Sequence, residues 1–210
     1  MTGADLLSES DRSAEAGDIP RARALLASAR MAFSRSSDHA GVAAVLRREA
    51  WFGEGEGRRR ALREAIQLAR KAGDRGGEVE GLEELSRAYS ESGELGPAVS
   101  LLGAAAEVSA AGGDRSGEAR AIELAGRLLC EAWGELRDPG AGLVLLLWSA
   151  ELTHKVNTDL ARMIEDYVRG YQYTLSNREF AAVEELLDLD RRAVVDATLL
   201  RFRSGWPVVP

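Results

Sequence analysis

One six-residue motif occurs twice in this chain, forty residues apart. Gly-Asp-Arg-Gly-Gly-Glu at 73–78 is followed by Gly-Asp-Arg-Ser-Gly-Glu at 113–118. A period between 20 and 50 residues is typical of repeat proteins, in which each supersecondary unit stacks on the next. Each copy of the motif ends one helical stretch and begins another. The sequence therefore predicts an all-α protein whose repeating unit is a pair of helices.

Composition and charge exclude some partners. Apolar residues make up 45% of the 210 residues but aromatic residues only 6%, so alanine and leucine are expected to supply most of the packing. The formal net charge of −7 argues against a nucleic-acid partner, because nucleic-acid-binding surfaces are basic.

The cysteine count and the hydropathy pattern indicate a compartment. The single cysteine, Cys130, excludes an internal disulfide and favours a reducing environment. Residues 1–5 lack the basic start and apolar segment of a signal peptide. The longest apolar run, 143–148, is shorter than the ~20 residues of a membrane span. We expect a cytoplasmic protein without a membrane partner.

Segment 76–115 gives the clearest example of one unit. Its two expected helices each carry a stripe of residues spaced by three and four, namely Leu82, Leu85, Ser86 and Tyr89 on the first and Ala98, Leu102 and Ala105 on the second. The small residues let two helix backbones approach closely, and the larger ones fill the space between them. Pro97 suits the first position of a helix, where its missing N–H costs nothing.

This order of small and large residues resembles the tetratricopeptide repeat. Leu82 stands where the family often has tryptophan, and the proline that usually ends the second helix is absent. The unit has about forty residues rather than the usual 34, which is similar to the long units of kinesin light chains and of bacterial regulator sensor arms. The resemblance implies a right-handed solenoid of helical hairpins, a superhelix whose concave face is lined by the first helix of each pair.

The same pattern extends less clearly over residues 3–189 and predicts about five helix pairs. The expected units are 3–36, 37–75, 76–115, 116–157 and 158–189, followed by a capping helix at 190–203 and an extended tail at 204–210. Terminal repeats need a cap with a polar outer face, which the arginines of 190–203 would supply. No segment between the units has the composition of a linker, so we predict one continuous domain over 1–210.

The outer units have predicted core stripes of their own. In the fifth unit the first helix is expected to bury Leu160, Met163, Ile164 and Tyr167, and the second helix Ala182 and Leu186. Segment 143–148 is apolar on every side, so it is either buried in the middle of the stack or forms a dimer or docking patch.

The stripe of the first helices that faces away from the core is the predicted partner-binding surface. It carries charged residues at positions forty residues apart in two units. They are Glu80, Glu83, Arg87 and Glu91 in the third unit, and Arg120, Glu123, Arg127 and Glu131 in the fourth. A groove with alternating charges would complement the mixed charges of a peptide or partner helix. Cys130 falls in the same stripe, so its thiol is expected to face the groove.

A solvated face without a partner explains the same stripe. Glu83–Arg87 and Glu123–Arg127 have the i,i+4 spacing of intrahelical pairs, which contribute about 0.2–0.5 kcal/mol each and arise readily without a ligand. Chaperone-binding members of the family hold a terminal carboxylate with basic and amide side chains. Glu83 and Glu123 occupy the corresponding faces here, so binding of a carboxylate chain end is disfavoured.

The sequence offers no pattern for catalysis. His39 and His154 are far apart, and no cysteine–histidine cluster has metal-binding spacing. The glycines and arginines of 53–60 lack the preceding strand of a phosphate loop, so they are expected to form a turn and the start of a helix. We therefore expect no enzymatic activity and no cofactor.

The predicted function is that of a protein–protein interaction scaffold or adaptor. It would bind a peptide or protein surface in the concave groove, as a monomer or weak homodimer. Two alternatives remain open, a ligand- or peptide-sensing regulatory arm that acts through a second protein, and a self-associating structural module.

Overall fold

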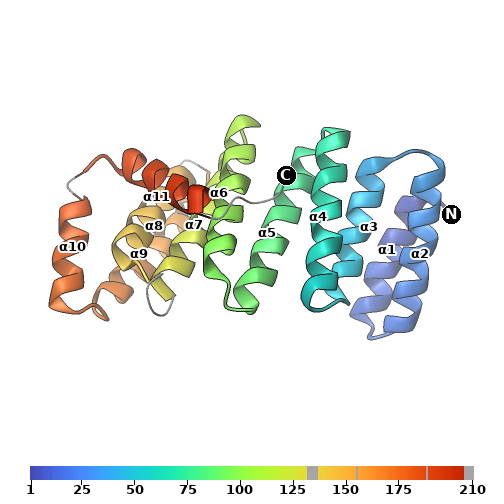
Figure 1. Cartoon of the computed structure of the whole chain (residues 1–210), viewed down its shortest axis with the longest axis horizontal. Helices are drawn as coiled ribbons and strands as arrows, with labels where there is room; N and C mark the ends of the chain where they lie inside the picture. The colour runs from blue at the N-terminus through green and yellow to red at the C-terminus, as the bar shows by residue number, and fades with distance from the viewer. Residues whose placement is uncertain (132–136, 155, 188, 206–210) are drawn as a thin grey trace. The chain divides into compact units, whose positions relative to one another are not determined.

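The computed structural model is helical throughout the part of the chain that it describes, residues 1–131, 137–154, 156–187 and 189–205. These residues form eleven α-helices and no β-strand, and Figure 1 follows them along the chain. The helices are α1 (Gly3–Glu15), α2 (Ile19–Arg35), α3 (His39–Trp51), α4 (Gly55–Ala72), α5 (Arg75–Glu91), α6 (Leu95–Ala111), α7 (Arg115–Glu131), α8 (Pro139–His154), α9 (Thr158–Gln172), α10 (Asn177–Leu187) and α11 (Arg191–Gly205). The predicted all-α class is confirmed. The predicted extended tail at 204–210 is wrong for residues 204–205, which continue α11, and its residues 206–210 lie outside the described part of the chain.

The chain forms two compact units, Met1–Ala88 and Tyr89–Pro210. In the first unit α1 packs on α2, α2 on α3 and α3 on α4. In the second unit α6 packs on α7, α7 on α8 and α8 on α9. Packing between consecutive helices within each unit is compatible with a helical repeat.

Five turns between helices share one geometry. Each contains a residue with positive φ followed by an acidic residue, at Gly17–Asp18, Ser37–Asp38, Gly73–Asp74, Gly93–Glu94 and Gly113–Asp114. In all five, the amide of the acidic residue donates to the carbonyl oxygen five residues earlier at 2.9 Å. This hydrogen bond closes the preceding helix, and glycine adopts the positive φ at the least cost. The motif at 73 and 113 therefore marks two of these turns.

The remaining residues of the motif begin the next helix. Asp74 and Asp114 each accept a hydrogen bond from the amide three residues later, at Gly77 and Gly117, over 2.9 Å. This contact caps the amino end of the helix. A side chain at Gly77 or Gly117 would collide with the capping carboxylate. This explains why both copies of the motif have glycine at their fifth position.

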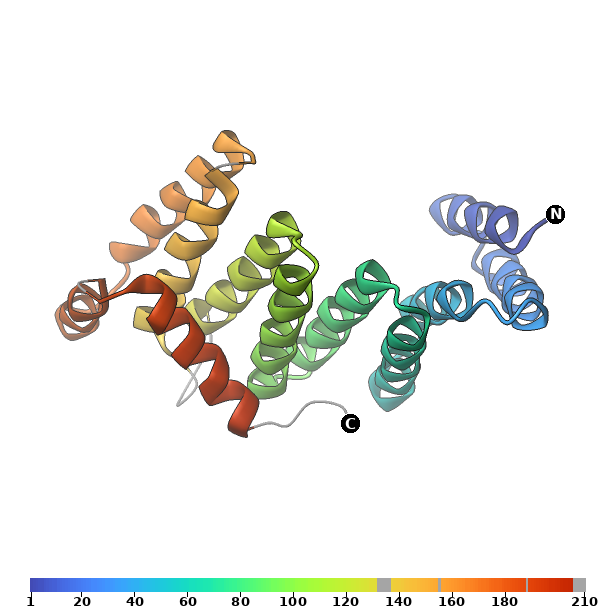
Figure 2. The same cartoon turned by 90° about the horizontal axis from the view of Figure 1, so that it is seen from above.

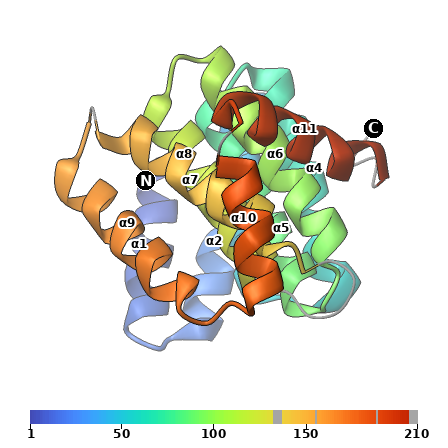
Figure 3. The same ribbon diagram turned by 90° about the vertical axis from the view of Figure 1, so that its left-hand side faces the viewer.

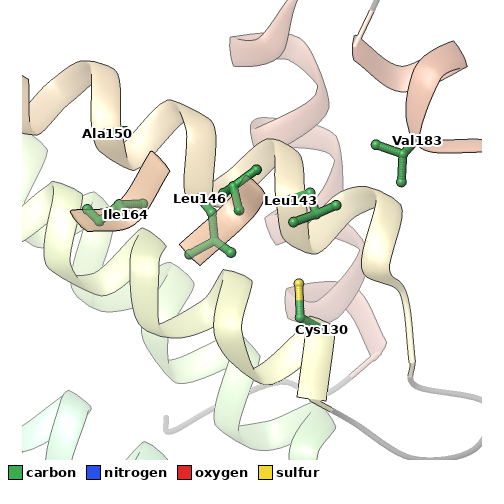
Figure 4. Packing of buried hydrophobic residues seen from close by; sticks show 7 residues of the cluster. Cys130, Leu143, Leu146, Ala150, Ile164 and Val183 are labelled. Carbon is green, nitrogen blue, oxygen red and sulfur yellow. The ribbon is translucent and has the colours of Figure 1, made fainter. Parts of the chain in front are cut away.

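Helix α8 is apolar on every side, which fits its position among four other helices. α7, α9, α10 and α11 all pack against α8, and residues 143–146 are fully buried. Figure 4 shows Leu143 and Leu146 among the side chains of the neighbouring helices. Of the two interpretations of segment 143–148, burial in the core is confirmed for residues 143–146.

Two glycines let α7 and α8 approach closely. A Cβ atom added at Gly126 would lie 2.8 Å from the carbonyl oxygen of Gly142, and one at Gly142 would lie 2.8 Å from that of Gly126. The two backbones therefore touch at this crossing, as the small residues of the predicted stripes require.

The predicted core of the fifth unit is wrong in part. Leu160 is 40% exposed and Met163 is 68% exposed, while α9 buries Ala161, Ile164 and Val168. On α10, Ala182 is exposed and its neighbour Val183 is buried. The physical reason is that α9 and α10 both turn toward α8, so each helix buries the face that meets α8 rather than the expected stripe.

Helix α11 lies against helices that precede the last pair in the chain. It packs against α6 and α8, and Figure 2 shows it turning back along the second unit. Figure 3 shows the same helix beside α6 from another direction. Its arginines pair with Glu107, Glu118 and Asp138, and the role of segment 190–203 as a terminal cap stays a prediction.

Candidate functional site

Three of the predicted charged residues form a connected cluster on α7. Arg127 pairs with Glu123 at 2.8 Å, which confirms the predicted i,i+4 pair. The guanidinium carbon of Arg127 lies 4.4 Å from the centre of the Tyr167 ring on α9. The Tyr167 hydroxyl donates a hydrogen bond of 2.8 Å to Glu131. The cluster therefore joins α7 to α9.

Tyr167 is held in place on both sides. Its ring stacks on Tyr171 with 6.1 Å between ring centres, and the Tyr171 hydroxyl donates to the carbonyl oxygen of Cys130. Burial, followed by the hydrogen bond to Glu131, raises the pKa of Tyr167 above its ordinary value. The phenol therefore stays protonated and remains a donor across the ordinary pH range.

An exposed apolar strip lies next to this cluster. Leu160, Met163 and Tyr167 have the spacing of residues on one face of a helix, and the first two are the exposed residues that break the predicted core pattern. Together with Glu123, Arg127 and Glu131 they define what we call the α7–α9 face. It combines apolar side chains that are open to contact with polar groups whose positions are already fixed.

Two carboxylates of α5 in the first unit, those of Glu80 and Glu84, contact Arg47 of α3. Glu80 forms an ion pair with Arg47, whose Nε also lies 4.0 Å from Glu84. Arg47 donates a further hydrogen bond of 3.2 Å to the carbonyl oxygen of Gly77. Burial is the largest influence on Glu84 and raises the pKa of its carboxyl group. Part of the predicted stripe therefore ties neighbouring helices together.

The other predicted residues are Glu83, Arg87, Glu91 and Arg120 on α5 and α7. Arg87, Glu91 and Arg120 are exposed, and Glu83 is half-buried. Glu83 and Arg87 belong to the first unit, while Glu91 and Arg120 belong to the second. A groove that runs from α5 to α7 stays a prediction.

The expectation that Cys130 faces the groove is wrong. Cys130 is 1% exposed and packs with Leu143 and Leu146 of α8, as Figure 4 shows. Burial raises the pKa of its thiol from 9.0 to about 12, so the residue behaves as a small apolar side chain. The thiol belongs to a buried cluster of α8 and α9 residues, and Tyr167 and Tyr171 pack against the same cluster.

A metal site and a membrane-spanning helix each place requirements on the described residues. Within them, no three His, Cys, Asp or Glu side chains form a group able to hold a metal ion. None of the helices in the same ranges has both the length and the hydropathy needed to cross a membrane.

Comparison with known proteins does not assign the chain to a family. No known family matches the sequence, and no curated protein matches it. The function must therefore be argued from the site.

Proposed function

We propose that this chain is a non-enzymatic, tetratricopeptide-like helical-repeat scaffold that binds a peptide or protein segment on the α7–α9 face. The observation that carries the proposal is the exposed strip of Leu160 and Met163 beside the fixed cluster of Arg127, Tyr167 and Glu131. Burying a leucine or methionine side chain completely contributes about 1.5–3 kcal/mol, so these two partly exposed residues would provide the apolar part of binding.

The polar cluster would provide orientation at low entropic cost. Arg127 is held by Glu123 and Tyr167, and Glu131 is held by the Tyr167 hydroxyl. Groups that are already ordered lose little conformational freedom when a partner binds. The face would therefore bind a partner that places an apolar side chain on Met163 and polar groups on Arg127 and Glu131.

The repeat assignment is supported by the shared turn geometry and by the close glycine crossing of α7 and α8. In a tetratricopeptide arrangement α7 and α9 are first helices of successive pairs, which line the concave side of a right-handed superhelix. The single cysteine and its burial suit a reducing, cytoplasmic setting.

Selection of peptides from a random display library tests the proposal. Peptides selected on the native protein should bind the Met163→Asp variant about tenfold more weakly, because the carboxylate removes apolar contact. Met31→Asp on α2 is the matched control, since Met31 is 54% exposed and lies in the first unit. The affinity of the selected peptides for the Met31→Asp variant should equal their affinity for the native protein.

Charge reversal examines the polar half of the site. Arg127→Glu should weaken the binding of the selected peptides, because the reversed charge repels the polar groups that Arg127 would contact. A failure to select any peptide, or equal losses in Met163→Asp and Met31→Asp, would contradict binding at the α7–α9 face. Those outcomes would favour the ligand-sensing or self-associating alternatives.

A further inference from the structure

Helix α11 has the chemistry of a basic amphipathic ligand helix. Between Arg191 and Gly205 it contains four arginines and one aspartate. It buries one mainly apolar strip, consisting of Val194, Val195, Thr198 and Phe202. The surface that it covers belongs to α6 and α8, which we call the α6–α8 surface.

Each arginine of α11 pairs with a different acidic residue of the surrounding helices. The pairs are Arg191–Glu151, Arg192–Glu118 at 3.1 Å, Arg201–Asp138 at 2.8 Å and Arg203–Glu107 at 2.6 Å. An apolar strip with a rim of carboxylates therefore receives an apolar strip with a rim of arginines. The surface therefore suits a helix that has an apolar strip flanked by basic side chains.

The forty-residue period shows how α6 accommodates a helix. Counting forty residues on from α4, Arg63 corresponds to Gly103 and Arg70 to Ala110. A Cβ atom at Gly103 would lie 3.5 Å from the Leu199 side chain of α11. The long side chains of α4 would occupy the space that α11 takes on α6.

The missing arginine is replaced by one from α11. In the first copy of the motif, Arg70 pairs with Glu78 at 2.5 Å. In the second copy, Glu118 has no arginine at position 110 and pairs with Arg192 instead. The carboxylate is buried in both copies, so Glu118 requires a guanidinium from another helix.

Space remains unfilled on both sides of Arg192. A cavity of about 670 Å³ is lined by Arg115, Trp148, His154 and Arg192, among others. A second cavity of about 300 Å³ is lined by Ile122, Val195, Leu199 and Arg192, among others. Both hollows are open to solvent, so a larger side chain than Val195 can enter the smaller one. The buried indole N–H of Trp148 has no acceptor among the described residues.

We propose that the α6–α8 surface is a second binding site, which α11 fills in the free chain and which takes a basic amphipathic helix of a partner protein. The partner helix carries a larger apolar side chain than Val195, and it displaces α11. The exchange restores a guanidinium to the buried Glu118 and covers the surface that Val195 and Phe202 cover in the free chain. The exposed ion pairs that are lost, such as Arg203–Glu107, contribute only about 0–1 kcal/mol each. The site shares no residue with the α7–α9 face, so each can fail independently.

A labelled synthetic peptide with the sequence of residues 190–205 tests this exchange. The Arg203→Glu protein loses its own pair with Glu107, whereas the peptide keeps its arginine. This protein should bind the peptide about fivefold more tightly than the native protein does. A peptide with Val195→Phe should bind more tightly still, because its ring fills the smaller cavity. Arg169→Glu on α9 is the matched control, since Arg169 is also an exposed arginine in an ion pair, and this variant should behave as the native protein does.

Three readings of the experiment would overturn the proposal. Equal binding to the Arg203→Glu and Arg169→Glu proteins, or no binding to either, would show that α11 is a permanent part of the fold. Weaker binding of the Val195→Phe peptide would show that the cavities do not accept a larger helix. Dimers of the Arg203→Glu protein in light scattering would show that a second copy, rather than a partner helix, takes the surface. Circular dichroism establishes that the variants keep native helicity.

Discussion

The guanidinium group of Arg127 lies over the ring of Tyr167, with 4.4 Å between its carbon and the ring centre. Arg127 belongs to α7 and Tyr167 to α9, so this contact links two helices that both pack on α8. Through this contact, charged residues of α7 and Tyr167 of α9 form one surface. The proposed binding face depends on this relationship.

A double-mutant cycle should measure the coupling between these residues. Arg127→Ala, Tyr167→Leu and the double variant remove the cation–π contact from each side. We expect a coupling energy of about 0.5–1 kcal/mol, the range for exposed cation–π pairs. Urea denaturation provides the three stability differences. A coupling energy near zero would mean that the cluster does not fix the position of Arg127.

Alkaline titration should show that the pKa of Tyr167 lies above the ordinary value of a tyrosine. Its folded pKa lies above its unfolded value of about 10, because burial and the hydrogen bond to Glu131 favour the protonated form. Its contribution to stability is therefore complete below about pH 10 and is lost as the pH rises through the folded pKa. Ultraviolet difference absorbance of the native and Tyr167→Phe proteins provides the comparison. The variant should lose the absorbance change of one tyrosine at the alkaline end of the curve, and an identical titration curve would contradict the assignment.

The Cys130 thiol should resist modification in the folded protein. Burial raises its pKa from 9.0 to about 12, which lowers the thiolate fraction at neutral pH roughly a thousandfold. A thiol–disulfide reagent should therefore react with one thiol per chain after denaturation and with almost none before. Rapid modification of the native protein would mean that Cys130 is accessible, as its place in the charged stripe first suggested.

Two glycines in the second unit should respond to alanine in opposite directions. Gly113 has a φ of 75°, so Gly113→Ala should destabilise the protein by about 1–2 kcal/mol. Gly170 lies in α9 with open space around its Cα, so Gly170→Ala should stabilise it by about 0.5–1 kcal/mol. Thermal unfolding of both variants checks the prediction. Equal effects of the two substitutions would contradict the proposed role of the turn.

The crossing of α7 and α8 should tolerate no added methyl group. Alanine at Gly126 or Gly142 would place its Cβ 2.8 Å from the carbonyl oxygen of the other glycine. Each substitution should cost about 1–3 kcal/mol, the usual range for overpacking. Chemical denaturation measures the loss, and a variant as stable as the native protein would mean that the helices separate easily at this point.

Sequence patterns predict the parts of this fold that are local. The turn at Gly113–Asp114 combines a positive φ with a helix cap, and both depend on residues within one short segment. The i,i+4 pair of Glu123 and Arg127 is local in the same sense. Residues four apart on a helix meet whatever the rest of the chain does.

The features that the sequence did not predict depend on distant helices. Leu160 and Met163 fit a core stripe by spacing, but the direction of α8 decides which face of α9 is buried. The buried Glu118 differs from Glu78 only in lacking an arginine eight residues earlier. That difference was a usable signal that another helix supplies the cation, but it could not identify Arg192.

Amide hydrogen exchange with and without a selected peptide tests the central claim most directly. If the peptide binds the α7–α9 face, exchange should slow in residues 120–131 of α7 and 158–171 of α9 and stay unchanged in α2. Met163→Asp should abolish this protection. Protection confined to α6, α8 and α11, or to the first unit, would contradict the claim that the α7–α9 face is the principal binding site.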